Sequence, residues 1–584
     1  MGRRRPASGL LLALVALALA PACRRGAAVD ETRVVPSPTS LADHCREAIG
    51  DPRVEEVAPG IFVAIGYDLA NTILVHTPDG NVVIDAMMGP ERAARAREAL
   101  LARAPGPTRA LIFTHSHIDH VGGASVWIEE GTEVWATAAF MPHFIKQYGV
   151  FNRAETARGT RQFGRQVDAA SLPCSALGAR PSLEGDVGGG VRAPTRTFRG
   201  DASFVVGGVT FELHEAHGET DDQLFVWLPD RRALMPGDNI YRAFPNLYTI
   251  RGTRPRPVDR WVKSLDAMRR LRPQVLAPSH TAPVRGEAAV EDALRNYRDA
   301  IAYVYAAVVR GANAGEGIDA MAARIGLPRH LAEDPWLREL YGQVDWSVRA
   351  IYGGELGWFD GQPEGLYTLS PADLAKKEIA MMGGAEAVQA AVDRELAGDP
   401  RFAAHLLRRL QESGLLGDAG AAWIAEREAR ALRGIAAGVA NTNGRGYLLQ
   451  SAIEREEGAP EAVRAQVDDA LLAAIPVEVF FDAMPPRLRL DEAAEVHESL
   501  AVRLEDRGLT VTITVRRGVV EVVYGDPLPG TPTPVATMIT DSLTWKRLAL
   551  RLTTPAAALT SGLLKIDGEA LGARRFLDRF DRGL

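Results

Sequence analysis

The spacing of hydrophobic residues divides the chain into three regions. Residues 50 to about 285 alternate short apolar runs with segments of helical spacing, which is typical of an α/β domain. From about 287 to 455 apolar residues recur at helical spacing, as in "AVEDALRNYRDAIAYVYAAVV" and "PRFAAHLLRRLQESGLL", and predict an all-α domain.

The third region begins after Pro460. The stretch "ESLAVRLEDRGLTVTITVRRGVVEVVYG" alternates apolar and polar residues, and predicts three strands joined by "DRG" and "RRG" turns. Gly525 to Pro534 is rich in Pro, Gly and Thr and predicts a loop inside this region. The closing "SGLLKIDGEALGARRFLDRF" predicts a helical tail, so the region is expected to be α+β.

Length and composition narrow the class of protein. A chain of 584 residues is too long for one core and suggests three or four domains. Its net charge of −7, with no basic block, argues against a nucleic-acid partner. No run of 18 apolar residues occurs, so no membrane-spanning helix is expected after the N-terminus.

The N-terminus predicts export to the periplasm. "MGRRRPASGLLLALVALALAPAC" has a basic start, an apolar stretch from Leu10 to Ala20 and small residues before Cys23, so residues 1–23 are expected to be a signal peptide and 24–49 a linker. Two outcomes stay open here: a lipid anchor at Cys23, or ordinary cleavage near Ala20 or Ala22. Cys45 and Cys174 could pair in an oxidising compartment, but the sequence does not show whether they are close.

Three histidines and an aspartate follow one predicted strand. "ALIFT" predicts a buried parallel strand, and His115, His117, Asp119 and His120 come directly after it. His115 and His117 are two residues apart and face the same way in extended backbone, whereas Asp119 and His120 can point to a second spot nearby. Imidazoles with a carboxylate suit zinc, so this turn predicts two metals, which such sites hold roughly 3.5–4 Å apart.

Three later strand ends offer further ligands. The loop "HEAHGETDDQ" contains two candidates, His217 and Glu219. "ALMPGDN" places Asp238 on a turn, where a carboxylate suits a position between two metals, and "QVLAPSH" ends in His280. Ligands from several strand ends are what a metal site at a sheet edge requires.

These residues carry a resemblance to a known superfamily. "THSHIDH" matches the T-H-x-H-x-D-H signature of the metallo-β-lactamase superfamily, and Asn71 to Gly89 resembles the opening hairpin of that fold. The resemblance implies an αββα sandwich over residues 50–286. It also implies that Asp85, where the hairpin ends, supports the ligands from behind, with a plain turn residue as the equal alternative.

A narrower resemblance is to the linear alkylsulfatases. "GDNIYRAFPNLYTIRG" is similar to their A-E-N…N-L-Y-T-L-R-G segment. In that branch one metal ligand is a glutamate 19 residues before the bridging carboxylate; Glu219 and Asp238 are 19 apart, which favours Glu219 over His217. The family's bridging glutamate is an aspartate here, and its T-E-A-P-A-E reads "GETDDQ".

The resemblance implies a complete site. Two zinc ions per chain would be held by seven side chains: His115, His117, Asp119, His120, Glu219, Asp238 and His280. The residues implied to act in catalysis and sulfate binding are Asp119, Arg251, Asn246 and Tyr248.

The resemblance extends over the rest of the chain. Val348 to Val388, with "LGWFDGQP" and "MMGG", resembles the family's dimerisation domain, so residues 287–458 are expected to be helical and to form a homodimer. Core packing is the favoured interpretation of Trp358 and Phe359. Residues 459–584 are similar to sterol carrier protein type 2, whose apolar tunnel would help to hold an aliphatic substrate.

The expected function is zinc-dependent hydrolysis of alkyl sulfate esters, such as dodecyl sulfate, to alcohol and sulfate. Two alternatives stay open, because a fold does not determine a substrate. One is another hydrolase of the same fold, acting on a lactone, a β-lactam or a phosphoester. The other is an exported lipid-binding protein.

Overall fold

The computed structural model describes residues 31–149, 151–181, 189–461 and 467–581. The predicted signal peptide and Cys23 lie outside these residues. Among the helices described, none is long and apolar enough to cross a membrane.

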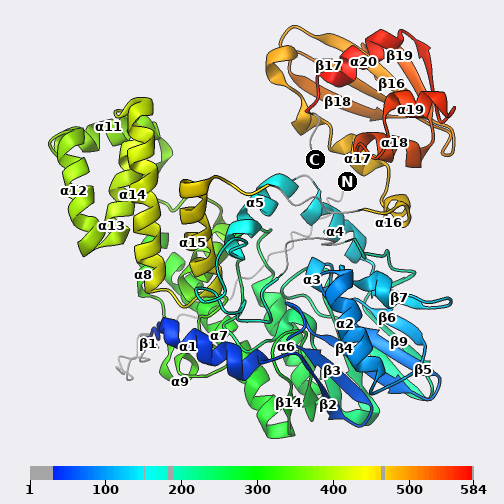
Figure 1. Ribbon diagram of the computed structural model, residues 1–584, viewed down its shortest axis with the longest axis vertical. Coiled ribbons are helices and arrows are strands. Elements are labelled where there is room, and N and C mark those ends of the chain that lie inside the picture. Colours follow the sequence, from blue (N-terminus) through cyan, green and yellow to red (C-terminus); the bar gives the residue numbers. More distant parts are fainter. Residues whose placement is uncertain (1–30, 150, 182–188, 462–466, 582–584) are drawn as a thin grey trace, which may run out of the picture.

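Two β-sheets packed face to face form the centre of the first region (Figure 1). Apolar side chains of both sheets share one core, among them Ile73 and Ile112 of the first sheet and Phe211 and Val226 of the second. The first sheet contains, in spatial order, β2 (Arg53–Ala58), β3 (Ile61–Ile65), β4 (Thr72–Thr77), β5 (Gly80–Ile84), β6 (Thr108–Ile112), β7 (Glu133–Thr137) and β8 (Arg196–Phe198). The second contains β14 (Val284–Arg285), β13 (Val275–Leu276), β12 (Ala233–Met235), β11 (Leu224–Leu228), β10 (Val209–Glu215) and β9 (Asp201–Val206).

Helices cover the outer face of each sheet. On the first sheet, α2 (Pro90–Leu101) packs Leu100 against the same core as Leu111. On the second, α6 (Val258–Arg270) and α7 (Glu287–Asn313) pack Trp261 and Tyr297 against Leu234. These layers confirm the predicted αββα sandwich. The predicted strand "ALIFT" is β6, buried and parallel to β5 and β7, as expected.

The helical region consists of two parts. α7, α8 (Ile318–Arg324), α9 (Arg329–Ala332) and α10 (Val344–Leu356) share a core with α6. Four further helices form a bundle with its own core, which stands apart at the left of Figure 1: α11 (Pro371–Met381), α12 (Ala385–Gly398), α13 (Pro400–Ser413) and α14 (Gly417–Ala437). Then α15 (Thr442–Glu457) packs on α5 (Asn152–Gln162) of the first region.

Two expectations for local structure are wrong. Residues 31–49, expected to belong to a linker, form a strand β1 (Glu31–Thr32) paired with β15 (Leu327–Pro328), a helix α1 (Pro38–His44) and a further helical turn. Trp358, interpreted as a core residue, is 78 % exposed. A large aromatic side chain is typical of a core, but Trp358 comes shortly after the last residue of α10, Leu356, where Leu356 and Gly357 are exposed as well.

The C-terminal region is α+β, with a five-stranded sheet. α16 (Asp469–Ala474) packs Leu471 into the core under α2, and α17 (Glu478–Asp482) leads into the sheet. The predicted "RRG" turn ends in Arg517 and Gly518, both at positive φ, as a tight two-residue hairpin turn requires. The sheet order is β18 (Val519–Tyr524), β17 (Leu509–Arg516), β16 (His497–Leu504), β19 (Ala536–Thr540) and β20 (Leu564–Gly568).

The predicted helical tail of this region is only partly helical, because it contains β20 before α20 (Ala570–Asp578). Along the chain, the helices α18 (Ser542–Ala549) and α19 (Pro555–Thr560) connect β19 to β20, which are neighbours in the sheet. The core is filled by large side chains, including Phe481 stacked on Trp545 and the buried Phe576.

Candidate metal centre

The turn that carries the histidines after β6 packs closely against the loop that follows β5. A Cβ on Gly122 would lie 1.8 Å from the Met88 carbonyl oxygen, and one on Gly123 would lie 2.2 Å from that of Ala86. No side chain fits at either position. The two glycines therefore allow the turn, with α3 (Ile118–Val121), to lie directly beside Asp85.

The structure brings the seven predicted ligands into one buried cluster. Their ligand atoms form three overlapping groups, each with all atoms within 4.8 Å of one another: His115, His120 and Asp238; Asp119, His120 and His280; His117, Glu219 and Asp238. The side chains come from the ends of β6, β10, β12 and β13, as the sequence predicted.

Asp238 occupies the middle of this cluster. One carboxylate oxygen, Oδ2, lies 3.1 Å from His280 Nε2 and 3.8 Å from His115 Nε2, and the other lies 3.4 Å from His120 Nε2. Asp238 thus contacts histidines from both sheets. An aspartate, although one methylene shorter than a glutamate, reaches all three.

Asp85 supports the cluster from behind. Its carboxylate accepts hydrogen bonds from the backbone and hydroxyl of Thr114 (both 2.9 Å), from His120 Nδ1 (2.8 Å) and from Ser279 Oγ (2.7 Å). A proton fixed on Nδ1 leaves Nε2 of His120 free to bind a metal. Asp85 is therefore more than a turn residue.

The other rings are oriented in the same way. His280 Nδ1 donates to the Leu69 carbonyl oxygen at 2.9 Å, and His115 Nδ1 lies 3.1 Å from Thr114 Oγ1. In each case the remaining Nε2 faces the cluster. The His115 Nε2 and His117 Nδ1 atoms lie 2.9 Å apart.

The donor set fits a cation. Three buried atoms of the cluster have no hydrogen-bond partner among the described residues: His120 Nε2, Glu219 Oε2 and Asp238 Oδ1. Leaving buried polar atoms unpaired costs roughly 1–3 kcal/mol each, more where the group is charged. Imidazole nitrogens and carboxylate oxygens in this number suit zinc or a similar first-row ion.

Burial and neighbouring charges set the protonation of the ligands. Burial lowers the pKa of His115 to about 3 and that of His117 well below its usual value, so both rings are neutral, the form that binds metal. Burial raises the pKa of the Asp238 carboxyl, but the surrounding histidines outweigh it and hold the pKa well below its usual range. Burial raises the pKa of Glu219 to about 7, against the opposing charge of Arg256.

The structure separates the two candidates of the loop after β10. Glu219 lies within the cluster, and its Oε1 atom is 2.7 Å from Arg256 Nη1. His217 is directed elsewhere, with its Nδ1 atom 2.9 Å from the Asp221 carbonyl oxygen. The spacing of 19 residues thus selected the residue that lies in the cluster.

Arg251 lies at the edge of the cluster. Its Nη2 atom is 3.2 Å from His117 Nε2, and Glu155 Oε2 lies 3.6 Å from its Nη1 atom. With the Gln147 amide turned so that its oxygen faces the guanidinium, that oxygen accepts from Nη1 and Nη2 at 2.8 and 2.9 Å. The backbone N–H of Arg251 donates to Gln162 Oε1 at 2.8 Å. These contacts therefore hold the guanidinium group of Arg251 in place beside His117.

Asn246 and Tyr248 lie on the same loop as Arg251. Asn246 is buried, and its Oδ1 atom has no hydrogen-bond partner among the residues described. The Tyr248 hydroxyl accepts a hydrogen bond from Arg158 Nη2 at 3.5 Å. Their roles stay predictions.

Two features were missed by sequence reasoning. Arg256 is buried against Glu219, although "TRPRP" looks like a solvated loop. Ser116, between the first two histidines, lies 2.9 Å from His143 Nδ1, and the same nitrogen lies 3.4 Å from the buried carboxylate of Asp222. This contact ties α4 (Phe140–Tyr148) to the loop of Glu219. Nothing in the sequence near either residue indicates these partners.

Cys45 and Cys174, left undecided by the sequence, form a disulfide with their Cα atoms 5.8 Å apart.

Three family models match the chain. They are described as metallo-beta-lactamase superfamily (residues 65–280), alkyl sulfatase dimerisation (317–458) and alkyl sulfatase C-terminal (465–583). A linear primary-alkylsulfatase from a Pseudomonas species is 30 % identical over 542 residues, which span 87 % of this chain and 98 % of the relative. An (R)-specific secondary-alkylsulfatase, also from Pseudomonas, is 28 % identical over 90 % of this chain and 80 % of its own.

A solved structure is similar over nearly the whole chain. The stereoselective inverting sec-alkylsulfatase Pisa1 from Pseudomonas aligns with a TM-score of 0.82 at 27 % identity, over 91 % of this chain and 85 % of its own.

Replacing Asp85 by asparagine should weaken metal binding about 10- to 100-fold. Asparagine tolerates the positive φ of this position, but its NH2 group would face donors that the carboxylate now accepts from. The measurement is zinc affinity by competition with a chelator, and the exposed Asp79→Asn is the matched control. Unchanged affinity in a folded Asp85→Asn protein would show that this carboxylate does not orient His120.

Proposed function

Since the chain belongs to the alkylsulfatases of the metallo-β-lactamase superfamily and is a hydrolase of alkyl sulfate esters, we propose that it acts through two zinc ions in the buried cluster. The observation that carries this proposal is the convergence of seven candidate ligand side chains, three of which have a buried polar atom without a hydrogen-bond partner among the described residues. The reaction follows from the family, and the proposed metal site follows from the geometry of the cluster.

The ligands divide into two sets with one shared member. His115, His117 and Glu219 would hold one ion. Asp119, His120 and His280 would hold the other, and Asp238 would serve both, because it belongs to groups that contain members of each set.

Bound zinc would supply Lewis acidity and make a water molecule nucleophilic at neutral pH. Asp119 lies 3.5 Å from His120 Nε2 and 3.6 Å from His280 Nε2, and it would also accept a hydrogen bond that orients the attacking water. Asp85 accepts a hydrogen bond from His120 Nδ1 and so fixes the orientation of this ring, which belongs to the same set of ligands.

Arg251 would bind the sulfate group. A sulfate monoester carries a fixed negative charge, and a planar guanidinium matches its oxygens with two parallel donors. Gln147 and Glu155 restrain the guanidinium, so little conformational freedom remains to be lost on binding. Asn246 and Tyr248 would donate further hydrogen bonds from the same loop.

The alternatives are less well supported. A lactone or β-lactam hydrolase does not need a restrained arginine beside the metals, and no relative reported above acts on a phosphoester. A lipid carrier with a vestigial metal region would not be expected to retain a complete buried ligand set.

We propose a homodimer, formed through the helical region that matches the dimerisation family. Large apolar side chains are exposed there: Trp358 at 78 %, Tyr367 at 95 % and Met381 at 89 %. In the proposed dimer, the partner subunit would bury these exposed apolar side chains.

We also propose export to the periplasm. The basic and apolar N-terminus motivates this, and a disulfide between Cys45 and Cys174 suits an oxidising compartment. The lipid anchor at Cys23 stays a prediction.

Purified, zinc-loaded protein should contain about two zinc ions per chain by elemental analysis. His115→Ala should lose at least one of them and all activity, because it removes a ligand, whereas the exposed His330→Ala should lose neither. Fewer than one equivalent in the loaded wild type would defeat the two-zinc proposal.

Arg251→Ala should lower kcat/KM for an alkyl sulfate at least about a hundredfold with metal content unchanged. Charge-assisted hydrogen bonds contribute roughly 1.5–3 kcal/mol each, and every 1.36 kcal/mol corresponds to a factor of about ten. Arg251→Lys should recover only part, because it restores the charge without the fork. The control is Arg254→Ala, an exposed arginine of the same loop. A ratio near one at full metal occupancy would contradict the sulfate-binding role.

Light scattering after size exclusion should give twice the mass of one chain, which is 63.0 kDa at full length. Replacing Trp358 and Met381 together by serine should shift the protein towards monomer, since it removes exposed apolar area that a partner would bury. Leu571→Ser, an exposed apolar residue of the C-terminal region, should leave the mass unchanged. A wild-type monomer would overturn the dimer.

A further inference from the structure

The disulfide joins an N-terminal helix to a segment beside the metal cluster. Cys45 directly follows α1, and Cys174, 129 positions later, begins residues 174–180, called the cysteine segment here. Both partners are covered by the cluster of apolar side chains that also contains Leu69 and Tyr241.

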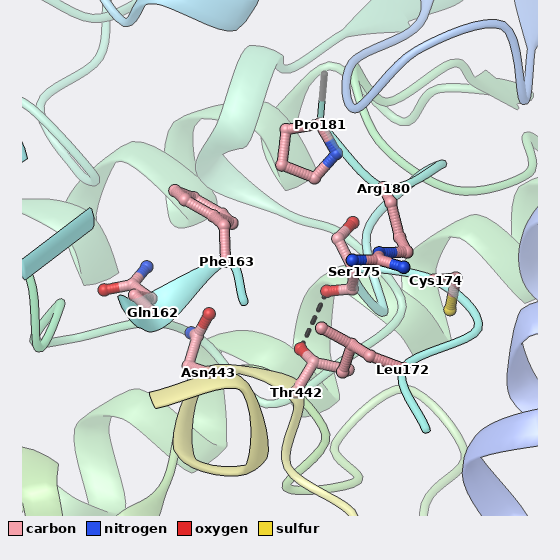
Figure 2. A pocket seen from close by; sticks show the side chains of 9 residues that line it. All are labelled: Gln162, Phe163, Leu172, Cys174, Ser175, Arg180, Pro181, Thr442 and Asn443. Carbon is pink, nitrogen blue, oxygen red and sulfur yellow. Dashed lines mark hydrogen bonds between the residues drawn. The ribbon is translucent and has the colours of Figure 1, made fainter. Parts of the chain in front are cut away.

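Further contacts hold the cysteine segment on both sides. His44 Nε2 donates to the Ala176 carbonyl oxygen at 2.7 Å, so α1 holds the segment next to the disulfide as well as through it. From the helical region, Thr442 Oγ1 donates to the Ser175 carbonyl oxygen at 2.8 Å, the dashed contact in Figure 2.

The segment contacts the backbone that orients His280. The Leu69 carbonyl oxygen accepts the hydrogen bond from His280 Nδ1, and Gly178 lies against this same carbonyl: a Cβ on Gly178 would be 1.9 Å from the oxygen. The Ala179 N–H donates to the Asp68 carbonyl oxygen at 3.0 Å. The cysteine segment thus fixes the position of the carbonyl that sets the ring of His280.

The segment also holds the residue that follows His280. The Thr281 N–H donates to the Leu177 carbonyl oxygen at 3.0 Å. The same short segment therefore restrains His280 in two ways. Gly178 fixes the Leu69 carbonyl that holds the ring, and Leu177 holds the backbone of the next residue, Thr281.

We propose that the Cys45–Cys174 disulfide is a positioning element of the metal centre, which acts on His280 through the cysteine segment. This inference rests on the two-zinc centre proposed above. Without the covalent link, the segment is held by hydrogen bonds alone, and the Leu69 carbonyl loses its fixed place. The ion held by Asp119, His120 and His280 is the one affected, because the contacts of the segment lead to His280 through Leu69 and Thr281.

The test is a zinc titration of metal-free full-length protein by calorimetry, with thermal unfolding measured in parallel. The variants His280→Ala and His117→Ala identify which binding step belongs to which ion. In a Cys45→Ser, Cys174→Ser double variant, the His280 step should weaken about 10- to 100-fold, the usual range for lost outer contacts, while the other step stays unchanged.

A second variant perturbs the same path with the disulfide intact. Gly178→Ala pushes on the Leu69 carbonyl and should weaken the same step. Ile301→Ala is the control: Ile301 is buried in α7, in a different core cluster from the segment, and its truncation should lower the melting temperature with both steps unchanged.

The outcomes separate the two proposals. If wild type binds no zinc, the proposed centre fails and this inference fails with it. If wild type binds two ions and both variants bind them with wild-type affinity, only this inference is overturned. Equal weakening of both steps, in proportion to lost thermal stability, would show that the disulfide is a general stabilising link and would also overturn it.

Discussion

The structure depends on one carboxylate placed between histidines of two sheets. Asp238 contacts His115 and His120 from the first sheet and His280 from the second, inside a cluster with almost no access to water. Buried charges are costly unless they are paired, and three atoms of this cluster, His120 Nε2, Glu219 Oε2 and Asp238 Oδ1, lack hydrogen-bond partners among the described residues. Bound cations would remove this cost. Metal binding would then also hold the two sheets together at this edge.

The groups around the cluster share one task, which is to fix the orientation of its rings. Asp85 accepts a hydrogen bond from His120 Nδ1, and the Leu69 carbonyl oxygen accepts one from His280 Nδ1, so that the opposite nitrogens face inward. The supports come from distant parts of the chain, and the proposed role of the disulfide extends the same principle to the N-terminal helix. Beside His117, Arg251 is restrained by Gln147 of α4 and Glu155 of α5. The site thus combines a buried cluster of histidines and carboxylates with one restrained arginine, an arrangement that suits hydrolysis of an anionic ester.

Much of this arrangement could be predicted from sequence because the relevant signals are local. The strand before the histidine turn, the two glycines after it and the 19-residue spacing of Glu219 and Asp238 led to the correct sheet edge. What could not be predicted depends on tertiary partners. The buried pair of Arg256 and Glu219, the disulfide and the contact of Ser116 with His143 join segments whose proximity no local pattern encodes. The prediction that Trp358 packs in a core was wrong, because residue type alone does not show whether a large apolar side chain is buried or exposed.

Anomalous X-ray scattering at the zinc edge from crystals of zinc-loaded protein tests the central claim most directly. The account predicts two strong peaks per chain. One should lie within about 2.0–2.2 Å of ligand atoms of His115, His117 and Glu219, the other within that distance of Asp119, His120 and His280, with Asp238 at both. A single peak, or peaks only at exposed histidines outside the cluster, would contradict the account.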